Sequence, residues 1–269
     1  MAHPSSAADT NVSANLLAYH QQGGNALHLH GEGGETHSRI AAGEWLATHE
    51  CRELFFICTQ VCHDDWDETA QLPIDRFTPE AFQQDIATDM ALIGTRYLNM
   101  VYLDDRPNLP YEPIVQAIGL EIAAGRLRSF GVRNFTAPRL HAIHSYARST
   151  IGQGVGAVIT TELSMLKANR PLWPEYVAFD ASLRQAVTDL GLSVFAHAGD
   201  LTLGQCLFGD AEPLARLRPE WVERWQHADN AVTVEKIKAL AAASGRTTRE
   251  VQMEWLLNQP FPVVGIVGV

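Results

Sequence analysis

The sequence is poor in cysteine, in positive charge and in long apolar segments. Its four unevenly spaced cysteines do not suit the disulfide framework of a secreted domain, so we expect reduced thiols in a cytoplasmic compartment. Lys and Arg number 20 against 31 Asp and Glu, giving a formal net charge of −11 at pH 7, which argues against nucleic acid or an anionic membrane as a partner. No apolar segment reaches the length of a membrane span, and the opening residues lack the basic and apolar regions of a secretion signal.

Short apolar segments instead alternate with amphipathic segments along the whole chain. Seven apolar segments, rich in β-branched and aromatic residues, are predicted to be strands: "NALHL", "ELFFICTQV", "YLNMVYL", "LRSFGV", "GAVITTEL", "LSVFAHA" and "PVVGIVGV". The acidic segment "CHDDWDE" after the second of these is expected to be a solvated loop. Strand–helix units repeated in this way imply a parallel sheet covered by helices. We therefore predict an α/β fold, a TIM-barrel-like (β/α) barrel, as one domain over residues 1–269, with residues 1–10 flexible.

The segments between the strands begin and end with helix signals. Thr78 and Pro79 are suited to the N-cap and the first position of a helix that ends at Gly94. Thr247 and Glu250 have the spacing of a capping box. Seven strands are one fewer than a closed eight-stranded barrel needs, so we expect an open edge that another element, or a second copy of the chain in a homo-oligomer, could cover.

Several segments carry a resemblance to a known family. The segment "YLNMVYLDDRPNLPYEPIVQAIGLEIAAGRLRSFGVRNFTAPRL" resembles the fourth strand, following helix and fifth strand of the aldo-keto reductases, with "GVRNF" where the family has "GVSNF". The segment "GGNALHLHGEGGETHSRIAAGEWL" is similar, without a gap, to the family's "GxNxxDTAxxYGxGxSExxxGxAL". The resemblance extends over roughly Asn11 to Val269. It implies the family's barrel, without a counterpart of its first strand or its C-terminal segment, and reduction of a carbonyl group with NADPH.

The residues that carry this chemistry in the family differ here. By the resemblance, the family's catalytic Asp, Tyr, Lys and His correspond to His28, Gly33, Gln60 and Asp104. Glycine has no proton to donate, and glutamine cannot supply the positive charge that lowers the pKa of a tyrosine. We therefore expect that the catalytic tetrad is lost.

The family's nicotinamide contacts also correspond to different residues. They fall at Arg133, near Thr160 and at His197. We therefore expect no cofactor and no bound metal.

Alternation along the strands places polar side chains on one face. His28 shares a face with His30, Gln60 with Cys58, and Asp104 with Tyr102. Because barrel enzymes carry their chemistry at the carboxyl ends of the strands, we predict one pocket formed by His28, Gln60, Asp104, Arg133, Glu162 and His197.

This set of residues favours proton transfer. We predict an enzyme of the dehydratase, cyclase or isomerase type that needs no cofactor and acts on a small carbonyl-bearing metabolite of a biosynthetic pathway. His28 and Asp104 would handle the proton, because an imidazole can transfer protons in both directions near neutral pH. Arg133 would stabilise an anion. Glu162, His197 and Gln60 would position the substrate.

Three alternatives stay open. The chain could be an NADPH-dependent aldo-keto reductase, as the resemblance implies. It could be a metal-dependent enzyme using His28 and His30, with Glu32, Glu35 and His37 as further donors. It could also be a non-catalytic relative that serves as a binding or scaffold module.

Overall fold

The computed structural model describes residues 12–29, 36–67, 69, 72–161, 163–171, 176–198, 204, 207–208 and 223–267. Residues 1–10, which the sequence predicts to be flexible, lie outside these ranges. The chain divides into two compact units at residue 157. The single-domain organisation stays a prediction.

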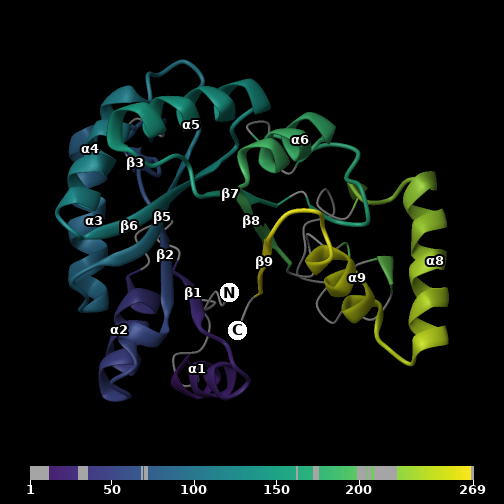
Figure 1. The fold of residues 1–269 in the computed structure, drawn as a ribbon. Helices are drawn as coiled ribbons and strands as arrows, with labels where there is room; N and C mark the ends of the chain where they lie inside the picture. The colour runs from purple at the N-terminus through teal and green to yellow at the C-terminus, as the bar shows by residue number, and fades with distance from the viewer. Residues whose placement is uncertain are drawn as a thin grey trace. The chain divides into compact units, whose positions relative to one another are not determined.

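The first unit is a parallel β/α arrangement (Figure 1). Its strands are β1 (Ala26–Leu29), β2 (Phe56–Gln60), β5 (Leu98–Asp104) and β6 (Leu127–Arg133), hydrogen-bonded in this order and parallel throughout. Its helices are α1 (Val12–Gln21), α2 (His37–Thr48), the short 3-10 helix η2 (Arg52–Leu54), α3 (Pro79–Ile93), α4 (Glu112–Ala123) and α5 (Ala137–Ile151). Helices α1 to α5 contact one another in chain order, and α4 packs against β6.

The second unit continues the alternation of strands and helices. Its strands are β7 (Ala157–Thr160), which begins at the boundary, β8 (Ser193–His197) and β9 (Val263–Ile266), and β8 and β9 pair in parallel. Its helices are α6 (Ala181–Leu190), α8 (Ala228–Ser244) and α9 (Thr248–Leu257). All seven strands that the sequence predicts are therefore present. No described helix is long and apolar enough to cross a membrane.

The helix ends follow the signals in the sequence. The Thr78 hydroxyl accepts a hydrogen bond from the backbone N–H of Ala81, and α3 ends at Gly94 in the left-handed conformation, φ 68°. The capping box of α9 is complete: the Thr247 hydroxyl accepts from the N–H of Glu250, whose carboxylate accepts from the N–H of Thr247. These caps provide hydrogen-bond partners for backbone N–H and C=O groups that have none inside the helix, and so stabilise the helix ends.

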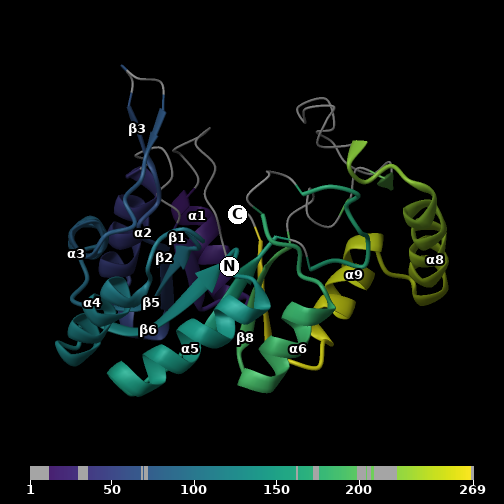
Figure 2. The ribbon, with the colours of Figure 1, turned by 90° about the horizontal axis from the view of Figure 1, so that it is seen from above.

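One expectation of the sequence is wrong. The acidic segment after β2 contains strand β3 (Asp65–Asp67), which pairs antiparallel with β4 (Leu72–Ile74) in a hairpin that projects from its unit (Figure 2). Asp65 is exposed, so the acidic composition correctly indicated contact with solvent. It could not indicate pairing, because the backbone of an exposed strand needs no apolar alternation to form its hydrogen bonds.

Candidate active site

The strands of the first unit separate apolar from polar side chains by face. One face carries buried apolar residues such as Leu27, Ile57, Val101 and Phe130. The other face carries three successive levels, which the register of the parallel strands defines. The first joins His28, Cys58 and Met100, the second joins Gln60, Tyr102 and Gly131, and the third joins Asp104 and Arg133. The third level lies closest to the carboxyl ends of the strands, where enzymes with parallel β/α folds place their chemistry.

Tyr102 connects the first two levels. Its hydroxyl lies 2.9 Å from Nε2 of His28 and donates a hydrogen bond of 3.2 Å to Oε1 of Gln60. Because a hydroxyl has a single proton to donate, this arrangement assigns the proton of the His28 contact to Nε2, so that the imidazole donates to the phenol oxygen. The two rings are also in tilted contact, with centroids 5.4 Å apart.

The Asp104 carboxylate holds the third level together. It accepts two hydrogen bonds of 2.6 Å from Nε and Nη2 of Arg133 and one of 3.1 Å from Nε2 of Gln60. The amide of Asn134 donates a fourth, longer bond of 3.3 Å. Two parallel N–H bonds from one guanidinium to one carboxylate are a strong and directional ion pair. Gln60 thus bonds both to Tyr102 and to Asp104 and joins the levels into one network.

Burial increases from the third level inward. The Arg133 and Asp104 side chains are 8% and 14% exposed, whereas His28 and Tyr102 have no exposed surface. The carboxylate of Asp104 and the guanidinium of Arg133 neutralise each other, and the guanidinium carbon lies 5.4 Å from the centre of the Tyr102 ring. The network therefore has a charged but neutralised outer level and an uncharged, water-excluded interior.

Comparison with known proteins identifies the family. A model of the aldo/keto reductase family matches residues 19–171, which is more than half of the chain and includes the whole network. The chain belongs to the aldo/keto reductase family. Among solved structures it resembles the glycerol dehydrogenase of Gluconobacter oxydans, with a TM-score of 0.72 and 15% identity over 97% of this chain and 76% of the other. A search of curated proteins found no match.

Membership of this family settles the fold class and corrects the predicted function. The TIM-barrel-like fold that the sequence predicts is confirmed by the alternating parallel elements and by the reductase structure that resembles them. The prediction of a cofactor-independent dehydratase, cyclase or isomerase is wrong, because both comparisons point to a family of oxidoreductases. That prediction treated four differences from a motif as a change of reaction, although a site can keep its chemistry with other side chains.

The structure brings together four of the six predicted site residues. These are His28, Gln60, Asp104 and Arg133, and Tyr102 and Gln60 connect His28 to Asp104. Glu162 lies outside the described residues, as do Gly33 and His30, so the loss of the tetrad and a metal site at His28 and His30 stay predictions. Within the part of the chain that the structure describes, no group of three His, Cys, Asp or Glu could hold a metal ion.

His197 belongs to the second unit. It ends β8, level with Ile266 of β9, and is partly exposed. Its predicted convergence with the residues of the first unit stays a prediction.

Two members of the network, Tyr102 and Asn134, were not among the predicted site residues. The sequence did place Tyr102 on the same face as Asp104, two residues later on the same strand, but gave it no role in the site. Asn134 has a left-handed backbone, with φ of 62°, which directs its amide toward Asp104. Asparagine tolerates this conformation better than most residues do, but the sequence does not show which backbone angle it adopts.

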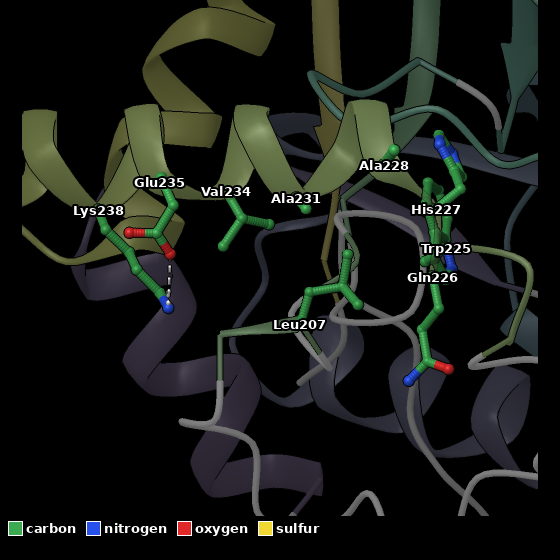
Figure 3. A pocket seen from close by; sticks show the side chains of 9 residues that line it. All are labelled: Leu207, Trp225, Gln226, His227, Ala228, Ala231, Val234, Glu235 and Lys238. Carbon is green, nitrogen blue, oxygen red and sulfur yellow. Dashed lines mark hydrogen bonds and ion pairs between the residues drawn. The ribbon is translucent and has the colours of Figure 1, made fainter.

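A separate cavity in the second unit lies along the first turns of α8 (Figure 3). It has a volume of about 520 Å³ and an apolar floor that includes Leu207, Trp225 and Val234. Glu235 and Lys238 line it as well, 3.3 Å apart in an exposed ion pair. No site residue predicted from the sequence lines this cavity. Among its described lining residues, the exposed pair of Glu235 and Lys238 is the only ion pair. The network of the first unit is therefore the candidate active site.

Proposed function

We propose that the protein is an NADPH-dependent oxidoreductase that interconverts a carbonyl compound and its alcohol. Membership of the aldo/keto reductase family supports the reaction class. The observation that assigns the reaction to this site is the contact of 2.9 Å between the Tyr102 hydroxyl and His28 Nε2. It supplies two neighbouring groups that can carry a proton, within a buried network at the carboxyl ends of parallel strands.

The outermost groups of the network fit the carboxamide of a nicotinamide. That carboxamide needs one hydrogen-bond donor and one acceptor as partners. Asn134 offers both on one side chain, and its bond to Asp104 is long, 3.3 Å, so a ligand could replace that bond at low cost. Arg133, the adjacent residue, adds N–H donors. Asn134 and Arg133 would therefore hold the nicotinamide, which supplies a hydride to the carbonyl carbon when bound.

The remaining residues of the network would act on the carbonyl oxygen. Tyr102 and His28 hold protons in a region from which water is excluded, and hydrogen bonds in such surroundings are stronger than in water. Asp104 holds Gln60 and Arg133 in place. The ion pair leaves the level without net charge, which suits a neutral substrate better than a carboxylate or a phosphate.

Titration with NADPH, followed by nucleotide fluorescence, tests the proposal. We expect a dissociation constant between roughly 1 µM and 1 mM, the usual range of enzyme–substrate affinities, and oxidation of NADPH when small neutral aldehydes are added. Glycerol and other alcohols would test the reverse reaction. Asn134→Gly keeps the left-handed backbone without steric cost and removes the amide, so it should weaken NADPH binding about tenfold, the value of one or two hydrogen bonds.

Asn258→Gly is the matched control. Asn258 is an exposed residue at the end of α9, so the same substitution there should leave NADPH affinity unchanged. The proposal is wrong if the wild-type protein binds no NADPH at millimolar concentration and oxidises none in the presence of aldehydes or ketones.

A further inference from the structure

Reduction of a carbonyl group needs a proton as well as a hydride, and the network has few groups that can provide it. This inference rests on the proposed function. Arg133 does not release its proton at any pH that proteins tolerate, and the amides of Gln60 and Asn134 are not acids. Both oxygens of Asp104 are already engaged by N–H donors, four in all. Within the network, Tyr102 and His28 are the two remaining candidates.

The register of the strands separates these two candidates. His28 is level with Cys58 and Met100, whereas Tyr102 is one level closer to the carboxyl ends, beside Gly131. Gly131 has no side chain, so nothing from β6 at this level competes for the space next to the phenol. A ligand that enters from the strand ends therefore meets the Tyr102 hydroxyl before it can meet the His28 ring.

We propose that Tyr102 donates the proton to the substrate oxygen and that His28 is its positioning residue. As the hydride bonds to the carbonyl carbon, the π electron pair of the C=O bond moves to the oxygen. The oxygen then takes the proton of the Tyr102 hydroxyl, which gives the alcohol and a phenolate. The N–H of His28 Nε2, 2.9 Å away, hydrogen-bonds the phenolate and holds it in place, and the phenolate recovers its proton from solvent when the product leaves.

The ion pair of the third level controls access to Tyr102. Tyr102 is fully buried in the free protein, and the guanidinium of Arg133 lies over its ring. For a substrate oxygen to reach the hydroxyl, the Arg133 side chain would have to turn away from the ring and from Asp104.

Tyr102→Phe tests this assignment, with Tyr97→Phe as the matched control. Tyr97 precedes the amino end of the same strand, and its hydroxyl bonds Glu53 outside the network. We expect Tyr102→Phe to lower kcat about 10²- to 10⁴-fold, the usual contribution of a general acid, with unchanged NADPH affinity. The unfolding midpoint should also fall, because His28 and Gln60 lose a buried hydrogen-bond partner, so kcat is compared well below that midpoint. Tyr97→Phe should keep kcat within about twofold.

A ligand that cannot be reduced gives a readout besides activity. The carboxamide analogue of the best aldehyde substrate keeps the carbonyl oxygen but does not react. Calorimetry of the protein saturated with NADPH should show this carboxamide binding roughly 3- to 10-fold more weakly to Tyr102→Phe, the value of one hydrogen bond. Tyr97→Phe should bind it as the wild type does.

His28 is tested by a conservative and a disruptive substitution. His28→Gln keeps an N–H donor that can hold the phenol, whereas His28→Leu removes it. We expect the pH profile of kcat to change in both variants, with several-fold higher activity in His28→Gln than in His28→Leu.

The outcomes separate this assignment from the proposed function. Wild-type reduction together with an equally active Tyr102→Phe variant would overturn the role of Tyr102 and leave the reductase standing. A wild-type protein that neither binds NADPH nor reduces carbonyl compounds would overturn both.

Discussion

Asp104→Asn should destabilise the protein far more than the loss of a surface ion pair does. Asp104 accepts four N–H bonds, two of them from Arg133, and the side chains of this pair are 14% and 8% exposed. The substitution leaves the buried guanidinium of Arg133 without a carboxylate partner. It also replaces one acceptor oxygen by an NH2 group, which then faces N–H donors that had bonded the carboxylate. Breaking a buried pair from one side costs about 3–5 kcal/mol.

Asp64→Asn provides the comparison. Asp64 pairs with Arg106 at 2.5 Å, but these side chains are 39% and 24% exposed. Exposed pairs contribute about 0–1 kcal/mol. For a chain of this size, 1 kcal/mol shifts the unfolding midpoint by roughly 2–4 °C, so we expect Asp104→Asn to lower it by roughly 10 °C and Asp64→Asn by less than about 4 °C.

Thermal and urea unfolding, followed by circular dichroism, measure both variants. The double variant Asp104→Asn/Arg133→Met removes the unpaired charge along with its partner. It should therefore recover more than half of the lost stability, because an apolar pair often replaces a buried ion pair at little cost. Equal midpoints for the two single variants, or no recovery in the double variant, would refute the view that a desolvated ion pair closes the site.

Three further predictions concern parts of the chain outside the network. Burial raises the pKa of Asp89, so this group contributes stability below its ordinary pKa of 3.8 that is lost as pH rises through the raised pKa. Asp89→Asn should therefore flatten the fall of unfolding free energy with rising pH in that acidic range, as urea titrations at several pH values would measure. Burial also raises the pKa of Cys62 from 9.0 to about 12, so its thiolate fraction near neutral pH falls roughly 1000-fold. A thiol reagent should modify it only after unfolding, and rapid labelling of the native protein would contradict this. Thr247→Ala removes a completed capping box and should cost about 1 kcal/mol, whereas Thr136→Ala, at an N-cap whose side chain makes no capping bond, should cost little in the same urea assay.

Much of the fold could be predicted from the sequence because its signals are local. Short apolar segments between amphipathic ones identified all seven strands. The Thr78 cap, the helix end at Gly94 and the Thr247 capping box also appear in the structure. Each of these depends on residues a few positions apart, so no distant contact is needed to read them. The β3–β4 hairpin was missed because its strands are three residues long and one of them is acidic.

The candidate site was predicted only in part. Parity placed Gln60 and Asp104 on the polar face, and both belong to the network. The predicted pairing of His28 with Asp104 was incomplete, because Tyr102 and Gln60 come between them. Alternation along a strand tells which face a side chain occupies, but its hydrogen-bond partners depend on the register between strands whose paired residues are 29 to 42 positions apart in the chain.

The sequence by itself determined the alternation of strands and helices, the faces of the strands, the helix caps and, through its motifs, the family. Only the tertiary structure decided that Arg133 neutralises Asp104 and that a phenol lies against the imidazole of His28. The physical reason is that local patterns fix backbone conformation residue by residue. The charge state and proton content of a site depend on atoms that only the register of four parallel strands brings within 3 Å of each other.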